Sequence, residues 1–310
     1  MLDFSKSKIF LIIFSIVLFY VCFIFYSDLE IFLKIYSQIN LSYLFLIFSL
    51  LPLTLFIRSR SQSILLNSIG INLSIKQNYH LFLTGLSMSI TPIGFGQVIK
   101  SHFLENKYGH SISKSLPLVF VERLLDFIAI ICLLWISLIF YFSNDTLIIL
   151  LISTSILFSL FLLLRFKKFI IKIQTIIKNN SFLSKKFPNF EEFNYSLMKL
   201  LTLKISIKTI LLISLVTALE GMMIYVGFLS FNIDLGYFES IQLFYTSVLV
   251  GIFSFLPGGI GITEGSFVLM LVKQNFEFVI ASSLIIFLRL ITIWSVTIIG
   301  FIATPLFSRK

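Results

Sequence analysis

The chain has 310 residues, of which 58% are hydrophobic and 12% are charged, and its mean hydropathy is +1.03. Soluble domains carry roughly twice that charged fraction, so the composition excludes a water-soluble fold. Apolar runs near the ~20 residues that cross a bilayer recur from end to end. The sequence therefore predicts an all-α polytopic membrane protein, with a single transmembrane domain over residues 1–310.

The apolar runs are of two kinds. Two of them, 79–104 and 238–272, are interrupted by Pro and Gly and are predicted to be re-entrant hairpins. The run 9–26 has no small-residue cleavage site, so it is predicted to be a retained span and not a signal peptide. The six continuous runs, predicted to be full spans, are 9–26, 41–57, 116–142, 147–164, 209–230 and 278–306.

The distribution of Lys and Arg supports the two hairpins. With a cytoplasmic N-terminus, every basic residue falls in a cytoplasmic segment except Lys34, Lys273, Arg123 and Arg289, as the positive-inside rule requires. We therefore expect both termini in the cytoplasm and a bacterial-type plasma membrane. The second hairpin leaves an alternative open, because 238–256 is long enough to span by itself.

The segment 165–208 is the only sizeable polar region of the sequence. It carries ten Lys or Arg residues among short apolar pairs. If the first hairpin crossed the membrane fully, this basic segment would face outward, against the positive-inside rule. Two interpretations fit the segment: a cytoplasmic connector, or an interfacial helix that touches anionic headgroups.

Both predicted hairpins carry the pattern P-x-G-apolar-G. It occurs as Pro92-Ile93-Gly94-Phe95-Gly96 and again as Pro257-Gly258-Gly259-Ile260-Gly261. Arg123 follows the first proline by 31 residues, and Arg289 follows the second by 32. An isolated copy would indicate only a kink or a close-packing point. Two copies with matched arginines predict an internal repeat.

The repeat units are predicted to be 41–142 and 209–306, each a span, a broken hairpin and a second span. The charge-derived topology makes the two units inverted relative to one another. Non-helical backbone at membrane depth persists only against protein or a wet cavity. Paired broken segments in matching positions therefore indicate a transporter binding site.

Six charged residues lie inside apolar runs, where each costs at least ~2.5–3.5 kcal/mol near a helix centre. Glu122 and Asp126 share a helix face, with Arg123 beside them. Any single residue could be part of a structural ion pair, but the set predicts a polar pathway or site in the membrane. The six are Glu122, Arg123, Asp126, Glu220, Glu264 and Arg289.

Basic side chains and free N–H groups at broken helix ends favour an anion. The predicted guest is a phosphate-bearing headgroup, and the predicted substrate-binding residues are Lys100, Arg123, Arg289, Gly94, Gly96, Gly258, Gly259, Gly261 and Thr263. The acids either balance the arginines or carry a proton or cation; they are Glu122, Asp126, Glu220 and Glu264.

Other polar residues are given no part in this site. Arg58 and Arg60, at the end of the second span, are predicted to be interfacial anchors. His80, His102 and His110 have no metal-ligand partners at suitable spacing, so neither a metal nor a cofactor is expected. No protease, hydrolase, nucleotide-binding or prenyl-diphosphate motif is present. No catalytic residue is predicted, and no nucleic-acid partner.

Several motifs together resemble a known family. They are Thr91 to Lys100, Glu122-Arg123-x-x-Asp126, Leu256 to Glu264, and Arg289 followed by Trp294 and Gly300. This set is similar to the flippase-like family, the transmembrane domain of lysylphosphatidylglycerol synthases, also called UPF0104 membrane proteins. Members usually carry Gly-Glu-x-x-Arg after the first glycine turn, where this chain has Gly96-Gln97-Val-Ile-Lys100.

The resemblance implies a function in lipid transport. The chain ends at Lys310 without the soluble aminoacyl-transferase domain of the synthases, so lysyl transfer is not expected. The leading hypothesis is a flippase that moves an anionic or phosphate-bearing membrane lipid between leaflets. The alternatives are a secondary transporter of a small soluble anion, a non-transporting scaffold, and an intramembrane lipid-modifying enzyme.

Overall fold

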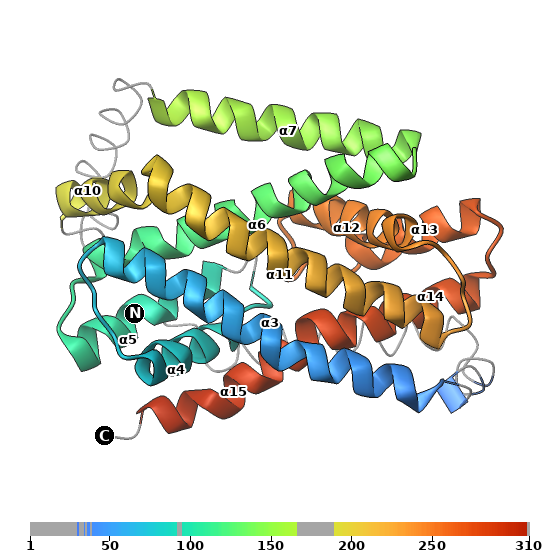
Figure 1. Cartoon of the computed structure of the whole chain (residues 1–310), viewed down its shortest axis with the longest axis horizontal. Coiled ribbons are helices and arrows are strands. Elements are labelled where there is room, and N and C mark those ends of the chain that lie inside the picture. Colours follow the sequence, from blue (N-terminus) through green and yellow to red (C-terminus); the bar gives the residue numbers. More distant parts are fainter. Residues whose placement is uncertain are drawn as a thin grey trace.

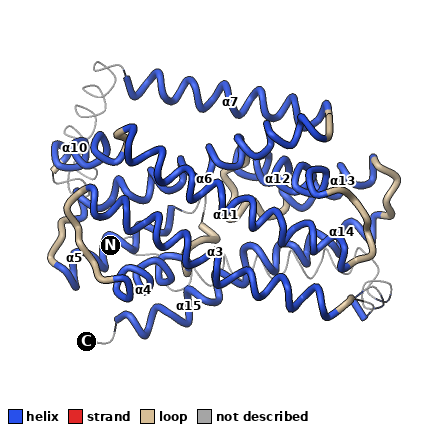
Figure 2. The backbone as a smooth tube through the Cα atoms, in the orientation of Figure 1, coloured by secondary structure: helices blue, strands red, loops and turns tan. Residues whose placement is uncertain are grey.

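The computed structural model describes residues 39–91, 95–165 and 189–308, together with Glu30, Lys34, Tyr36 and Ser37. Within these ranges the chain consists of helices joined by short loops (Figure 2). The predicted first span 9–26, the predicted site residue Gly94 and most of the polar connector, 166–188, lie outside the described residues.

Four helical segments in the described part are long and apolar enough to cross a bilayer, which makes this an integral membrane protein. They correspond to the predicted spans at 41–57, 116–142, 209–230 and 278–306. The segments are Leu41–Ser68 (α3), Ile112–Phe140 (α6), Leu203–Ser230 (α11) and Phe278–Thr304.

The last of these segments is not a single α-helix. It comprises α14 (Phe278–Arg289), a π-helical turn (Leu290–Trp294) and α15 (Ser295–Ser308). The remaining elements are shorter: α4 (Ile75–Leu86), a 3₁₀ turn (Phe95–Val98), α5 (Ile99–Tyr108), α7 (Asn144–Arg165), α10 (Phe190–Leu200), α12 (Tyr237–Phe253) and α13 (Ile262–Lys273). The predicted span 147–164 lies within α7.

The same order of elements occurs twice: a long helix, a short helix, a break, a short helix and a long helical segment. The first series is α3, α4, α5 and α6, and the second is α11, α12, α13 and α14 to α15. The two opening helices, α3 and α11, have 28 residues each and pack along one another in opposite directions (Figure 1). The first short helix of each series contacts the closing segment of the other, α4 against α15 and α12 against α6.

The residues that flank each broken segment lie near one another. At the second one, Gln274 after α13 donates a hydrogen bond to Glu239 at the start of α12 (3.1 Å). At the first, Gly70 before α4 lies beside Lys114 of α6, whose Nζ is 3.7 Å from the position of a Cβ at Gly70. At ~1.5 Å per residue, none of the helices in the two broken segments (α4, α5, α12 and α13) reaches the ~30 Å of a hydrocarbon core.

Helix α3 continues past the predicted span end at residue 57. The prediction ended the span at the first charged residue, Arg58, but the sequence contains no helix-ending signal there. The helix stops where Gly70 adopts φ +75°, and the N–H of Ile71 bonds back to the carbonyl of Leu66 (3.0 Å). Arg58 therefore lies inside the helix.

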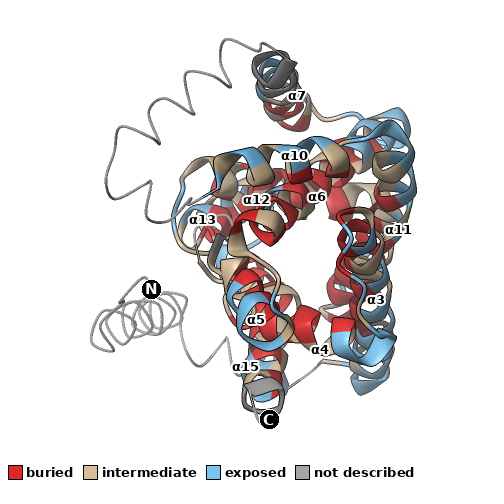
Figure 3. Cartoon of the chain, turned by 90° about the vertical axis from the view of Figure 1, so that its left-hand side faces the viewer, coloured by how far each residue is buried: buried red, intermediate tan, exposed pale blue. Residues whose placement is uncertain are grey.

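Viewed along the bundle, buried residues face inward from every long helix, and exposed apolar residues cover the outside (Figure 3). The described part of the connector includes α10, which packs against α6, with Phe193 edge-to-face on Phe120 at 6.2 Å. Leu200 at the end of α10 is fully buried in the hydrophobic core, so α10 is part of the helix bundle.

Candidate functional site at the meeting of two helix breaks

The two breaks meet inside the bundle. A Cβ at Gly258 would stand 3.4 Å from Ile90, beside the first break, and 3.4 Å from Ile293 in the π-helical turn. Gly258, Gly259 and Gly261 have φ of +61°, +66° and +88°, a region that glycine adopts at little cost. The predicted glycines of the second motif are therefore required by the backbone of the break itself.

The second break is closed by a buried ion pair. Nε of Arg289 donates to Oε1 of Glu264 at 2.7 Å, and another guanidinium N–H donates to the carbonyl of Gly258. The other oxygen of Glu264 accepts the N–H of Gly261 at 2.7 Å. Glu264 is fully buried and Arg289 nearly so. Arg289 thus joins the closing segment to the break, and the π turn follows it directly.

Thr263 and Gly96 are held by local packing. The Thr263 side chain lies between Gly251 and Gly259, where a Cβ at either glycine would come within 3.0 Å of its Oγ1. At the first break, the N–H of Gly96 donates to Oγ1 of Thr91 at 2.7 Å. Thr263 and Gly96 therefore stabilise the local backbone of their breaks, and the charged side chains near each break come from other positions.

The first break also has an ion pair, but with the charges exchanged. Here the short helix after the break carries the cation and the long helix carries the acid, whereas at the second break the short helix carries Glu264. Lys100, on α5, is 1% exposed and donates to Glu122 on α6 and to Oε1 of Gln62 on α3 (3.0 Å). Gln62 in turn donates to Oδ1 of Asn78 at 2.9 Å, and Asn78 donates to the carbonyl of Ser59 at 2.7 Å. Four helices are tied together by this buried polar network.

Arg58 belongs to the charged cluster inside the bundle, which corrects the prediction that it is an interfacial anchor. Its guanidinium bridges Asp126 on α6 (Nη1 to Oδ1, 2.6 Å) and Glu220 on α11 (Nε to Oε1, 3.1 Å; Nη2 to Oε2, 3.0 Å). Two carboxylates in the membrane interior stabilise one arginine far better than lipid could. Arg60, two residues on, is exposed, as expected of an anchor.

Arg123 is less fully engaged than the other buried cations. Its Nη2 lies 3.1 Å from Asp126, which Arg58 also contacts, and 3.4 Å from Oε1 of Gln97. Its Nε is buried but meets no acceptor among the described residues. Its side chain is 26% exposed, against 4% for Arg289. Arg123 therefore has one guanidinium N–H without a partner among the described residues, and part of its side chain is exposed.

The charged residues predicted for the site lie in two groups. One contains Lys100, Glu122, Arg123, Asp126 and Glu220, together with Arg58, and the other contains Glu264 and Arg289. Four cations face four carboxylates, so the interior is balanced in charge. Sequence reasoning missed Arg58, Gln62 and Asn78. The sequence has no helix-ending residue between Arg58 and Gly70. That feature would have extended the predicted helix and placed Arg58 and Gln62 in the interior.

Comparison with known proteins places the chain in a family of membrane proteins. The family described as "Lysylphosphatidylglycerol synthase TM region" matches residues 10–300. The chain belongs to the lysylphosphatidylglycerol synthase TM region family. It is 31% identical to a UPF0104 membrane protein of Methanocaldococcus jannaschii over 227 residues, 72% of this chain and 94% of that protein. It is 22% identical to a UPF0104 membrane protein of Methanothermobacter thermautotrophicus over 271 residues, 80% of each chain.

Membership confirms the resemblance carried by the glycine and charge motifs. Arg289 lies within the region that matches lysylphosphatidylglycerol synthase TM regions, as do both breaks and all the other charged residues of the site. The matched region is a membrane region, and it contains the whole described helical bundle up to residue 300.

Proposed function

We propose that this protein translocates a lipid with an anionic, phosphate-bearing headgroup between membrane leaflets, without changing it chemically. The observation that carries the proposal is the meeting of two helix breaks beside eight charged side chains within the bundle. Such a polar interior is costly in a membrane and is typical of a substrate pathway. The name of the matched family, which refers to a lipid synthase, favours a lipid over a soluble anion.

The balanced charges suggest how the headgroup moves. A phosphate that approaches the site meets the partly exposed side chain of Arg123, and it must then compete with carboxylates for the other cations. Each such exchange gives the phosphate a cation and releases one carboxylate, which must then be neutralised by a proton or by another donor. In this proposal Glu122, Asp126, Glu220 and Glu264 are exchange partners for the headgroup.

Alternating access would follow from an inverted repeat. Arg58 and Glu220 each lie 17 residues after the first residue of their 28-residue helices, α3 and α11. They form an ion pair between these two antiparallel helices, so matched positions of the two units meet each other. The Lys100–Glu122 pair joins α5 to α6, and the Glu264–Arg289 pair joins the matching elements α13 and α14 with acid and base exchanged. Re-entrant hairpins related in this way would open to one leaflet in turn.

The ends of the bundle favour the predicted orientation. The end with the α3–α4, α5–α6 and α10–α11 connections carries Lys76, Lys107, Lys114, Lys199 and Lys204, with Glu105, Glu191 and Glu192. The opposite end carries Asp145, Asp234, Glu239 and Glu277 with Lys273. By the positive-inside rule the basic end faces the cytoplasm.

Leaflet exchange of headgroup-labelled phospholipids in proteoliposomes tests the proposal. The native protein is expected to exchange lipid faster than protein-free vesicles, and Arg289→Ala and Glu264→Gln are each expected to abolish the exchange. Arg60→Ala is the matched control and should exchange normally. No exchange of anionic or zwitterionic lipids, with accumulation of a soluble anion such as phosphate inside the vesicles, would contradict the proposal.

Arg123 and Arg289 are expected to differ in the same assay. Arg123→Gln should lower exchange about 10-fold, the equivalent of one charge-assisted hydrogen bond, with little change in melting temperature. Arg289→Gln should also lower the melting temperature, because it leaves Glu264 buried without its cation. Equal losses of thermal stability in the two variants would show that Arg123 is a structural residue and not a headgroup contact.

A further inference from the structure

The charged cluster around Arg58 is balanced only while it holds no headgroup. Its two arginines, Arg58 and Arg123, face two carboxylates, Asp126 and Glu220. A phosphodiester headgroup would bring one further negative charge into this cluster. An unpaired charge at membrane depth is costly, so a positive charge must enter with the headgroup. The contacts of the two carboxylates indicate which of them receives it.

The two oxygens of Asp126 are held by different arginines. Oδ1 accepts from Nη1 of Arg58 at 2.6 Å, and Oδ2 lies 3.1 Å from Nη2 of Arg123. Both oxygens of Glu220 are instead bound by Arg58, at 3.1 and 3.0 Å. When Arg123 turns to a phosphate, Oδ2 of Asp126 loses its cation, whereas Glu220 keeps both of its contacts. Asp126 is therefore the carboxylate that needs a new positive charge.

The titratable side chains nearest to this cluster are already engaged. Lys100, on α5, donates to Glu122, the other acid in this part of α6. Tyr237 and Tyr245, on α12, each donate to a main-chain carbonyl of α11, at 3.0 and 3.2 Å. Because each of these groups has a partner of its own, none of them replaces Arg123 at Asp126.

The charged groups on the other helices packed against α6 are engaged elsewhere or exposed. On α10, Glu192 accepts a hydrogen bond from the start of α6, Lys199 lies over a tyrosine ring, and Glu191 is exposed. On α7, Asp145 pairs with Lys273. The positive charge for Asp126 must therefore come from outside the protein.

We propose that Asp126 takes up one proton at Oδ2 each time an anionic headgroup takes Arg123, so that one proton crosses the membrane with each headgroup. This inference rests on the proposed function and names its coupling ion. An O–H bond forms at Asp126 on the side where the headgroup enters. That bond breaks on the other side, when the headgroup leaves and Arg123 returns to the carboxylate. Headgroup and proton together are neutral, so transport moves no net charge.

A proton suits this position better than a metal ion. Two guanidinium groups flank Asp126 and repel a metal ion, and the described residues contain no group of three acids, histidines or cysteines that could hold one. A proton instead bonds to a single oxygen. The Asp126 and Glu220 side chains are 17% and 27% exposed, whereas Glu264 is fully buried. The cluster around Arg58 is therefore more accessible to protons from water than the pair at the second break.

Proteoliposomes with labelled phosphatidylglycerol, whose phosphodiester carries one negative charge, test this proposal. A difference of one pH unit across the membrane is expected to drive the labelled lipid to about a tenfold excess in the leaflet that faces the more alkaline side. A potassium diffusion potential of about 60 mV, which equals the same tenfold ratio for one charge, is expected to have no effect at equal pH. Together these two results define transport coupled to one proton.

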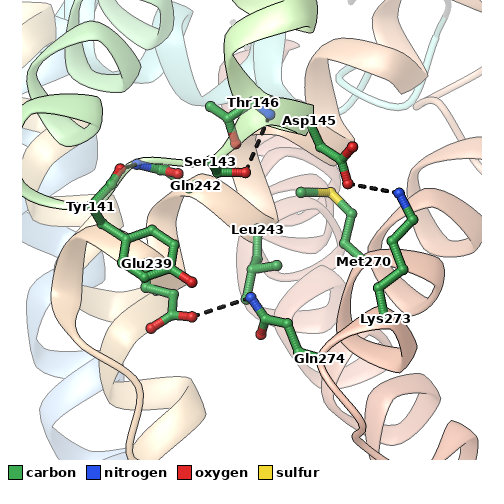
Figure 4. A pocket seen from close by; sticks show the side chains of 10 residues that line it. All are labelled: Tyr141, Ser143, Asp145, Thr146, Glu239, Gln242, Leu243, Met270, Lys273 and Gln274. Atoms are coloured by element: carbon green, nitrogen blue, oxygen red, sulfur yellow. Dashed lines mark hydrogen bonds and ion pairs between the residues drawn. The ribbon is translucent and has the colours of Figure 1, made fainter.

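Asp126→Asn is expected to exchange the two responses. The amide keeps the size of the side chain but removes the charge that needs a proton, so the headgroup crosses with its own negative charge. The lipid distribution should then ignore the pH difference and follow the 60 mV potential, about tenfold. Asp145→Asn is the matched control and should respond as the native protein does. Asp145 lies at the α6–α7 turn, on the wall of a small pocket outside the proposed lipid site (Figure 4).

A second measurement needs no variant and keeps the test valid if Asp126→Asn fails to fold. When lipid is added to the outer leaflet only, a pH dye inside the vesicles should report one proton for each lipid that crosses. Lipid movement without proton movement, coupling to a sodium difference at equal pH, or an Asp126→Asn variant that still follows the pH difference would overturn the proposal and leave the proposed function standing. No movement of the labelled lipid under any gradient would instead reject the proposed function, and this inference with it.

Discussion

Replacing Arg58 with leucine is expected to destabilise the protein by about 3–5 kcal/mol, because it leaves two carboxylates in the interior without their shared cation. Asp126 and Glu220 each receive hydrogen bonds from this guanidinium. They come from α6 and α11, so the variant also weakens the contact among the three longest helices of the described bundle. Unfolding by denaturant in detergent measures the loss.

Arg60→Leu is the matched control for Arg58→Leu. It removes the same type of side chain two residues away, but Arg60 is exposed, so its effect should stay within about 0.5 kcal/mol. Neutralising both acids in the Arg58→Leu background, with Asp126→Asn and Glu220→Gln, should recover part of the loss. If Arg58→Leu were as stable as Arg60→Leu, Arg58 would be an interfacial anchor after all.

Gly300→Ala is expected to destabilise the protein by about 1–3 kcal/mol or more through overpacking. A Cβ at Gly300 would stand 2.1 Å from the backbone nitrogen of Ser87 and 2.5 Å from the carbonyl carbon of Leu86. Both are main-chain atoms at the edge of the first break, so they cannot rotate away as a side chain could. Helix α15 would have to move away from α4. Thermal unfolding in detergent measures the effect.

Gly265→Ala, in the interior of α13, should have the opposite sign. No described atom outside its own helix lies within 4 Å of the position of its Cβ, and its φ is ordinary. Alanine there should stabilise the helix by about 0.5–1 kcal/mol, because glycine loses more backbone entropy on folding. If Gly300→Ala also raised stability, the close approach of α15 to the first break would be wrong.

Much of the membrane architecture could be predicted from residues close together in the chain. Hydropathy depends on local composition, so the spans at 41–57, 116–142, 209–230 and 278–306 correspond to long apolar segments of the bundle. The second Pro/Gly motif likewise marks the break between α12 and α13, since the positive φ of Gly258, Gly259 and Gly261 is a local demand of the backbone.

The sequence by itself thus determined an all-helical membrane protein, the places of its breaks and the presence of charges within its spans. Only the tertiary structure decided which charges meet, because pairing depends on helices that are distant in sequence. The matched spacing of Arg123 and Arg289 suggested equivalent arginines. In the structure, the pair that corresponds to Glu264–Arg289 is instead Lys100–Glu122. Arg58 is held in the interior by Glu220, which lies 162 residues away in the sequence.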